Sequence, residues 1–367
     1  MAEIKGKLGF GCMRLPMKDG EVDKDRFDEM VDAFIGAGFN YFDTAHGYID
    51  GKSELAICES LTKRYDRDAY VLADKLSNWC FDKEEDIEPL FERQLERCGV
   101  QYFDYYLFHA MNHEAYEKHK RCNSFEIVKK LKEQGKIKHI AMSFHDTAEY
   151  LDYILTEQPC MEMVQLQFNY LDYDDPTVQS KACYDVAVKH GKKVIVMEPV
   201  KGGALVNLPQ RAKDALTTLG EGSEASYALK FTTSFPEIAL VLSGMGDMDM
   251  MNDNINSLTN PVPYTDAELD EFAKVREIIR EIKQIPCTSC NYCADVCCAN
   301  VAVSKVFAIY NLYLSAKISR SEASEQLSKY HDNISGCIKC GKCESNCPQS
   351  IKIRDWLEKI KKISGQG

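Results

Sequence analysis

The chain has 367 residues, of which 45% are apolar and 28% are charged, and its formal net charge at pH 7 is −12. This length suits one large domain with a smaller one. The acidic balance argues against a nucleic-acid partner, because a phosphate backbone requires a basic face. No apolar run reaches the roughly 18 residues of a membrane span, and MAEIKGKLGF lacks the apolar core of a signal peptide. We therefore expect a cytoplasmic protein without a membrane partner.

Short β-branched or aromatic runs alternate with amphipathic stretches through the first two thirds of the chain. A hairpin is expected around residues 8–20, and helical spacing marks Ile87–Cys98, after Asp82, and the stretch after Thr147. The predicted strands are Leu8–Met13, Asn40–Phe42, Ala69–Ala73, Tyr105–Phe108, Ile137–Met142, Met163–Gln167, Lys193–Met197 and Ile238–Leu242. Eight strand–helix units favour an α/β fold of the (β/α)8 TIM-barrel type over a doubly wound sheet. No GxGxxG follows a predicted strand, which also disfavours a Rossmann domain.

Reactive residues of such barrels lie at the C-terminal ends of the strands. Asp43 and Tyr48 follow the second predicted strand, Lys75 follows the third, and His109 follows the fourth. Hydride delivery to a carbonyl builds an alkoxide, which needs a proton donor and nearby positive charge. A phenol, with an ordinary pKa of about 10, becomes a better acid beside an ammonium group that stabilises its phenolate. Singly, such an aspartate is more often a cap and such a lysine is more often solvated, but the phrase DTAHGYIDGKSE favours catalysis.

These segments resemble the aldo/keto reductase family over roughly residues 5–260. The resemblance rests on DTAHGY, on the strand ending in Asp74-Lys75 and on LFH. It extends in order through MSFH (142–145), QLQFNY (165–170), MEPVKGG (197–203) and SGMGDMDMMNDNI (243–255). It implies Tyr48 as the general acid, Lys75 as the modulator of its pKa, Asp43 as the partner of Lys75, and His109 as the residue that orients the substrate.

The resemblance also implies NAD(P)H as the cofactor. The positions that it implies for cofactor binding are Ser143, Gln165, Met197, Pro199, Val200, Gly202, Gly203, Ser243, Gly244, Met245 and Asn254. Phe144 stands where the family often has asparagine, and Met197 where many members stack an aromatic ring on the nicotinamide. Gly244 and Met250 stand where members that prefer NADPH have lysine and arginine, and Asp247 and Asp249 are close by. Because carboxylates repel a phosphate, we expect a slight preference for NADH.

Cysteine usage changes sharply along the chain. Seven of the sixteen cysteines are scattered through the first 286 residues, and nine fall in the last 81. Single scattered cysteines are typical of small buried apolar side chains. The predicted organisation is therefore a barrel over residues 1–262, a linker and helix over 263–283, and a cysteine-rich domain over 284–367.

Two cysteine motifs with identical spacing lie in this last domain. Cys287, Cys290, Cys293 and Cys297 form CxxCxxCxxxC, and Cys337, Cys340, Cys343 and Cys347 repeat it before a proline. This is the bacterial ferredoxin run, in which the fourth cysteine ligates the other cluster. Disulfides are disfavoured in a reducing compartment, and zinc sites use separated CxxC pairs. We predict two [4Fe–4S] clusters, and the ligands are Cys287, Cys290, Cys293 and Cys347 for the first and Cys337, Cys340, Cys343 and Cys297 for the second.

The second domain carries further signals. Cys298 stands where proline is usual, so either Cys297 or Cys298 could be the ligand, and the spacing favours Cys297. Helical patterns fill Val301–Tyr330, with Ser319 or Ser321 as a start. A small two-stranded ferredoxin has no room for these helices. The tail resembles the all-helical ferredoxin domain that follows the barrel in a bacterial and archaeal subfamily of the aldo/keto reductases.

The sequence thus predicts an NAD(P)H-dependent oxidoreductase that interconverts a small carbonyl compound and its alcohol, with clusters for electron transfer or redox sensing. The alternative is a non-catalytic, nicotinamide-sensing barrel attached to an electron-transfer or scaffold module; Tyr48 together with Lys75 argues against it. A hydride carries two electrons and each cluster carries one. A flavin could link them, although no flavin motif is visible, and a redox partner protein could exchange electrons with the clusters. His113 and His119 are expected to be solvated residues of the barrel rim.

Overall fold

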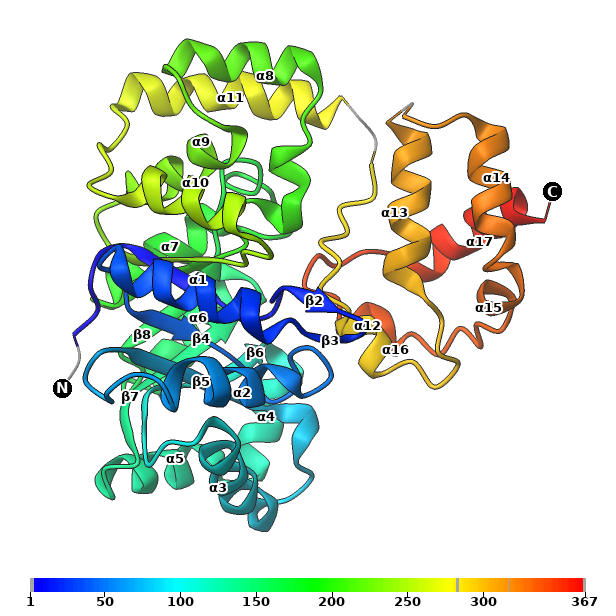
Figure 1. The fold of residues 1–367 in the computed structure, drawn as a ribbon. Helices are drawn as coiled ribbons and strands as arrows, with labels where there is room; N and C mark the ends of the chain where they lie inside the picture. Colours follow the sequence, from blue (N-terminus) through cyan, green and yellow to red (C-terminus); the bar gives the residue numbers. More distant parts are fainter. Residues whose placement is uncertain (1–2, 282–283, 316, 366–367) are drawn as a thin grey trace. The chain divides into compact units, whose positions relative to one another are not determined.

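The computed structural model describes residues 3–281, 284–315 and 317–365, and Figure 1 shows their helices and strands. Contacts divide the chain into two compact units. The first unit comprises residues 1–200 and 219–270, and the second comprises residues 201–218 and 271–367. The second unit therefore contains, besides the C-terminal part of the chain, a short stretch that follows the predicted seventh strand.

The first unit is a closed barrel of parallel strands, which confirms the predicted fold class. Around the barrel the strands follow the order β1, β10, β9, β8, β7, β6, β5 and β4, and β4 closes it by pairing with β1. They are β1 (Leu8–Gly11), β4 (Tyr41–Asp43), β5 (Val71–Ser77), β6 (Phe103–Met111), β7 (Ile137–Phe144), β8 (Met163–Gln167), β9 (Lys193–Met197) and β10 (Ile238–Ser243).

Apolar side chains from successive strands meet in one core cluster. Its members are Tyr41, Val71, Ala73, Leu107, Ala141, Met163, Ile195, Leu240 and Leu242. These residues alternate with others that point the opposite way, because side chains of a strand alternate between its two faces. Since helices cover the other face, the barrel strands are buried almost throughout, as parallel strands are elsewhere.

The helices of the first unit surround the strands (Figure 1). They include α1 (Lys24–Gly36), α2 (Lys52–Ile57), α3 (Ile87–Cys98), α4 (His113–Arg121), α5 (Ser124–Glu133), α6 (Ala148–Glu157), α7 (Ser180–Lys189), α9 (Glu224–Thr233) and α10 (Met248–Leu258). The prediction for α3 is confirmed, and Thr147 caps α6 by accepting a hydrogen bond from Tyr150 N. Asp82 caps no helix, because a short 3-10 turn (Glu84–Asp86) precedes α3.

The predicted hairpin around residues 8–20 is wrong in its first arm. Leu8–Gly11 pairs in parallel with β4 and β10, and the hairpin joins β2 (Met17–Lys18) to β3 (Glu21–Val22). Asp19 and Gly20 make its turn with φ values of 52° and 83°. An Asp-Gly pair with two positive φ angles is typical of a tight two-residue hairpin.

The second unit is helical in its C-terminal part, as predicted. Its helices include α8 (Gln210–Leu216), α12 (Tyr292–Asp295), α13 (Val303–Leu314), α14 (Arg320–Ser328), α15 (His331–Ser335), α16 (Lys342–Ser345) and α17 (Ile353–Ser364), and α11 (Asp266–Arg280) begins just before the division at residue 270. Ser319, not Ser321, starts α14 with a reciprocal capping box to Glu322. Apolar residues of α13, α14 and α17 form the core of this unit. None of the described helices is long and apolar enough to cross a membrane.

Candidate active site and cluster segment

The barrel register brings the predicted acid and lysine together. Asp43 is the last residue of β4, and Lys75 lies near the end of the neighbouring β5. The ammonium of Lys75 donates to Asp43 Oδ1 at 2.5 Å and to the Thr44 carbonyl oxygen at 2.7 Å. Neither side chain is more than 3% exposed. A buried charge is tolerated when it is paired and hydrogen-bonded, so this pair holds a fixed cation under the mouth of the barrel.

Tyr48 and His109 complete the group. The ammonium of Lys75 lies 4.7 Å from the centroid of the Tyr48 ring. The rings of Tyr48 and His109 meet edge to face, with their centroids 5.9 Å apart. The structure therefore brings all four predicted catalytic residues into one cluster, with Tyr48 in the loop between β4 and α2.

Ser77 fixes the imidazole of His109. The strand register places these two residues side by side on β5 and β6, and Ser77 Oγ lies 2.6 Å from His109 Nδ1. Burial lowers the pKa of His109 well below its usual range, and the charge of Lys75 lowers it further. The ring is therefore neutral at pH 7, and a Ser77 hydroxyl that donates to Nδ1 leaves the proton on Nε2. The ring of Trp79 lies 4.9 Å away, centroid to centroid.

A buried polar network behind these residues escaped the sequence analysis. Glu54 is fully buried, lies 3.1 Å from His46 Nδ1 and accepts a hydrogen bond from Arg97. Asp74, also fully buried, accepts from the backbone N–H of Lys75 at 2.7 Å and from Gln94 Nε2 at 3.1 Å. Burial raises the pKa of Asp74 well above its usual range, and Glu54 adds to this effect. The sequence contains Glu54 and Asp74 next to the predicted catalytic residues, which could have indicated this network. Their partners Arg97 and Gln94 come from α3, however, and spacing along the chain does not reveal these contacts.

The predicted nicotinamide residues of the first unit lie at adjacent strand ends. Ser143 on β7 and Gln165 on β8 are register partners, and both are almost fully buried. Ser143 Oγ accepts a hydrogen bond from Ala110 N at 2.8 Å. Gln165 Nε2 contacts Met197 Sδ at 3.6 Å, and Gln165 Oε1 has no hydrogen-bond partner among the described residues. A buried carbonyl oxygen without a donor fits the amide N–H of a nicotinamide carboxamide.

The predicted phosphate end lies after β10. Asn254 Nδ2 donates to Ser243 Oγ at 2.8 Å, which ties α10 to the strand end. A Cβ at Gly244 would lie 3.5 Å from Cβ of Arg14, so an arginine from the loop after β1 lines this turn. Met245 is fully buried, whereas Met250 is 52% exposed. Arg14 was not predictable from the sequence, because 230 residues separate it from the turn.

Two of the predicted cofactor-binding glycines belong to the other unit of the chain. Gly202 and Gly203 belong to the second unit, whereas Pro199 and Val200 belong to the first. A Cβ at Gly202 would lie 2.5 Å from the carbonyl oxygen of Thr288, so the glycine allows this backbone to approach. Its neighbour Lys201 is 5% exposed and donates to Gln349 Oε1 at 3.0 Å. These residues pack against both cysteine motifs of the second unit.

The two cysteine motifs have the same backbone shape. Positive φ angles occur at Ser289, Asn291 and Asn300, and again 50 residues later at Lys339, Gly341 and Ser350. The turn hydrogen bonds repeat as well: Cys297 N donates to Ala294 O, and Cys347 N donates to Glu344 O. A positive φ strains any residue other than glycine, and such strain is typical of ligand-holding segments. Two equivalent loops therefore present the predicted ligands.

The thiols of the two motifs lie near one another. Burial raises the pKa of Cys293 to about 12, and the neighbouring thiols of Cys287, Cys347 and Cys343 raise it further. Burial raises the pKa of Cys343 to about 11, with Cys337, Cys297 and Cys340 among its other neighbours. The fourth cysteine of each motif thus lies near the other motif. Within the described residues, no three His, Cys, Asp or Glu side chains are close enough to hold a single metal ion.

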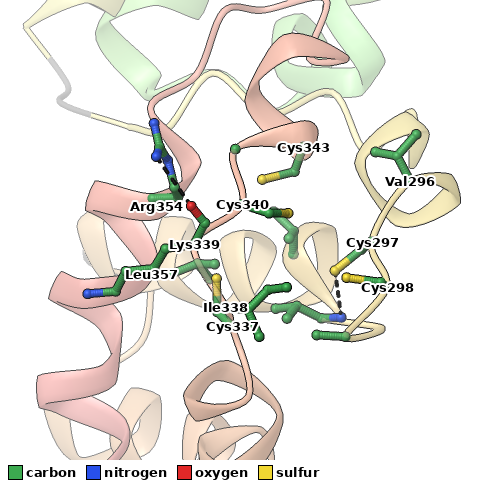
Figure 2. A pocket seen from close by; sticks show the side chains of 14 residues that line it. Val296, Cys297, Cys298, Cys337, Ile338, Lys339, Cys340, Cys343, Arg354 and Leu357 are labelled. Carbon is green, nitrogen blue, oxygen red and sulfur yellow. Dashed lines mark hydrogen bonds between the residues drawn. The ribbon is translucent and has the colours of Figure 1, made fainter.

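A pocket is formed by the second ligand set. Figure 2 shows the side chains of Cys297, Cys337, Cys340 and Cys343 around it, together with Arg354. Cys298 also lines this pocket and is exposed. Val301 N donates to Cys297 Sγ at 3.3 Å, the kind of contact that hydrogen-bonds a ligating sulfur in cluster proteins. The donor set, four thiols around one hollow, fits an iron–sulfur cluster.

Comparisons with known proteins agree with this geometry. Residues 286–352 match the 4Fe-4S dicluster domain. The oxidoreductase YqkF of Bacillus subtilis is 21% identical over 282 residues, which cover 68% of this chain and 86% of that relative. The fold is that of an aldo-keto reductase from Bacillus halodurans, with a TM-score of 0.62 and 22% identity over 73% of this chain and 91% of that one.

A second solved structure is an aldo-keto reductase from Klebsiella pneumoniae in complex with NADPH. Its TM-score is 0.60 at 18% identity, covering 75% of this chain and 96% of that one. Residues 7–277 match the model of the aldo/keto reductase family. The chain therefore belongs to the aldo/keto reductase family of oxidoreductases and carries a C-terminal 4Fe-4S dicluster domain.

Proposed function

We propose that this chain reduces a small aldehyde or ketone to its alcohol, or catalyses the reverse oxidation, with NAD(P)H as the hydride donor. The observation that carries the proposal is the buried Lys75, whose ammonium binds Asp43 and lies against the ring of Tyr48. A reduced nicotinamide, when bound, supplies a hydride to the carbonyl carbon. The hydroxyl of Tyr48 then donates the proton that the carbonyl oxygen requires.

The other residues support this proton transfer. Lys75 stabilises the phenolate that Tyr48 becomes, and Asp43 keeps the ammonium charged and in place. Neutral His109 donates from Nε2 to the carbonyl oxygen and so orients the substrate. Gln165 and Ser143 would hold the carboxamide of the nicotinamide. Burial of the four proposed catalytic side chains excludes water, which strengthens each of these interactions.

The test is Tyr48→Phe, which removes the proton donor and keeps the ring. We expect kcat/KM for a panel of aldehydes and ketones with NADH or NADPH to fall by about 10²- to 10⁴-fold. Tyr153→Phe is the matched control, since Tyr153 is 43% exposed on α6 and should change nothing. Equal turnover by wild type and Tyr48→Phe, with nicotinamide still bound in calorimetry, would instead support the sensing barrel.

We propose a preference for NADH over NADPH. Asp247 caps α10 and Asp249 lies in its first turn, so two carboxylates stand beside the turn that would receive a 2′-phosphate. Arg14 is a cation at the same turn and favours the pyrophosphate that both cofactors share. The measurement is the ratio of kcat/KM for the two cofactors, and a ratio that favours NADPH would contradict the preference.

We further propose that the second unit holds two [4Fe–4S] clusters, ligated by the exchanged sets given above. The grouping of Cys293 with Cys347, and of Cys343 with Cys297, supports this arrangement. Protein prepared without oxygen should carry about eight irons and absorb broadly in the visible region. A colourless protein that contains zinc would contradict the proposal. Exchange of electrons between the clusters and a nicotinamide would require a bound flavin, which takes up two electrons as a hydride and releases them one at a time. Without a flavin, the clusters would exchange electrons with a partner protein.

A further inference from the structure

The two cysteine motifs differ in their charge, although their backbones match. Residues 287–312, around the first motif, contain one aspartate and one lysine, a formal charge of zero. Residues 337–362, around the second, contain seven lysines or arginines and three acids, a formal charge of +4 in a chain whose total is −12. The segment around the second motif is therefore locally basic, whereas the equivalent segment around the first motif is neutral.

The basic side chains lie beside the second ligand set. Lys339 and Arg354 line the same pocket as Cys337, Cys340 and Cys343 (Figure 2). Lys339, Arg354 and Lys361 also line a second surface pocket that includes Cys337. Two acids partly balance them, since Lys339 pairs with Glu358 at 2.9 Å and Arg354 pairs with Glu344 at 2.7 Å. An excess of cations remains, and Lys342 in α16 adds to it.

The second motif is also open to solvent and carries an apolar contact point. Ile338, between the first two cysteines of this motif, is 66% exposed, and Cys340 is exposed as well. At the equivalent position of the first motif stands Thr288, which is 2% exposed and packs against Gly202. At this position the same backbone thus presents an apolar side chain to solvent in the second motif and buries a threonine in the first.

We propose that the second motif is the docking surface for an acidic one-electron carrier protein, which exchanges electrons with the second cluster. This inference rests on the proposed presence of the two clusters. An acidic carrier is repelled by the net charge of −12 of the whole chain and attracted by the local excess of cations beside the second ligand set, so its approach is steered toward the second cluster. Exposed Ile338 offers the apolar centre that protein interfaces usually have, inside a charged rim.

The step is a single electron transfer. When the carrier is the donor it is oxidised by one electron and the cluster is reduced by one; when the cluster is the donor the reverse holds. No bond forms or breaks, and no proton moves. Because the surrounding cations stabilise the more negative, reduced cluster, the second cluster should have the higher reduction potential of the two.

The experiment uses the full-length protein with both clusters, reduced by dithionite and freed of excess reductant. The probe is an oxidised plant-type [2Fe–2S] ferredoxin, which is acidic, and the basic counterpart is cytochrome c. In stopped-flow mixing we expect the second-order rate constant with ferredoxin to fall by about 10-fold or more when salt is raised from 0.01 M to 0.5 M, since screening removes the steering. Calorimetric binding of oxidised ferredoxin, in which no electron moves, should weaken in parallel.

The matched variants reverse two charges each. Lys339→Glu with Lys342→Glu should lower both the ferredoxin rate constant and its affinity by about 10-fold or more at low salt. Lys305→Glu with Lys317→Glu makes the same charge change on exposed residues of this unit outside the second motif, and should leave both values near those of wild type. Iron content and the visible spectrum show that each variant keeps its clusters.

Several results would overturn the docking surface. The first is that the two double variants bind ferredoxin equally well. The second is that the protein reacts faster with cytochrome c than with ferredoxin at low salt. The third is that the protein sediments with phosphatidylserine vesicles and that this depends on the lysines. The failure of the cluster proposal is distinct, because it would appear beforehand as iron well below eight per chain. Carbonyl reduction by the barrel is measured separately and is untouched by either outcome.

Discussion

At the scale of single residues, the hydrogen bond between Ser77 and His109 holds the imidazole in position. Its length is 2.6 Å, and both side chains are at least 98% buried. In Ser77→Ala the ring loses this partner, and we expect kcat to fall by about 10-fold, the equivalent of one hydrogen bond, with KM for the nicotinamide unchanged. Ser77→Thr keeps the hydroxyl and should restore most of the rate.

The measurement is steady-state kinetics over pH 5–9. A positioning role for Ser77 predicts that the acid limb of the kcat/KM profile shifts in Ser77→Ala, because the titration of His109 changes with its partner. A uniform loss of rate at every pH, with no shift, would show that Ser77 contributes only to packing.

Met250 offers a second test at this scale. It is 52% exposed in the first turn of α10, beside the acids Asp247 and Asp249. Met250→Arg places a guanidinium where a 2′-phosphate would lie, and we expect the NADPH-to-NADH ratio of kcat/KM to rise by about 10-fold. Met250→Leu controls for the loss of the methionine side chain. An unchanged ratio in both variants would mean that the phosphate lies elsewhere.

Residue types at predicted strand ends, together with the resemblance to the aldo/keto reductases, were enough to predict the four candidate catalytic positions. The partners of these residues were not predictable. Ser77 matters because the register sets it opposite His109, and Arg14 matters because barrel closure brings it to Gly244. Both relations depend on contacts between distant parts of the chain, which one sequence does not contain.

At the scale of elements, substitutions in the two cysteine motifs can test which cysteines ligate each proposed cluster. Cys297 and Cys347 are fourth cysteines that lie near the opposite motif, while Cys298 is exposed beside them. We expect Cys347→Ser to lose one cluster, about half of the iron, and the remaining signal to be that of the second cluster. Cys298→Ser should keep the full iron content.

Iron analysis together with electron paramagnetic resonance of the reduced protein measures both outcomes. If Cys298→Ser loses a cluster and Cys297→Ser does not, the ligand assignment in the first motif is reversed. The repeated positive φ angles at Ser289 and Lys339 argue that the two motifs use equivalent positions, which favours Cys297.

The elements themselves were largely predictable. Runs such as Met163–Gln167 and Lys193–Met197 are strands with the predicted bounds, because buried parallel strands carry a strong apolar signal. The strand predicted at Leu8–Met13 is present as β1, but the hairpin predicted around residues 8–20 begins later, at Met17. The true partners of β1 start at Tyr41 and Val241, and no local signal marks a pairing over that distance.

At the scale of the whole molecule, three histidines whose pKa values are lowered in the folded chain make stability depend on pH. His119 was expected in solvent but is fully buried on α4, where Phe81, Phe108 and Phe125 surround it and neither ring nitrogen has a partner among the described residues. Burial lowers its pKa to about 3 and that of His145 to about 4, and it lowers the pKa of His109 as well. All three are therefore neutral in the folded protein near pH 6.

An unfolded chain binds protons on these residues below pH 6.5, while the folded chain does not. The contribution of these histidines to the free energy of unfolding should thus be complete above pH 6.5. It should fall by about 1.4 kcal/mol per pH unit for each histidine as the pH drops toward 4. Urea unfolding of the protein at pH 7.5, 6.0 and 5.0 measures this slope.

His119→Phe removes one of the three protons, and its slope should be smaller by about a third. His113→Phe is the control, because His113 is at the exposed start of the same helix. Equal slopes in all three proteins would show that other groups control the acid sensitivity.

The short stretch 201–218 contacts the cysteine-rich part of the chain, and this limits where the protein can be truncated. Gly202 leaves no room for a side chain against Thr288, and Lys201 is covered together with Gln349. A stop codon placed after the linker helix would remove both of these neighbours and uncover a cation and a bare backbone in the middle of the remaining chain. The cysteine-rich end is therefore not a detachable accessory: a truncation that spares every catalytic residue would still damage the loop that follows β9.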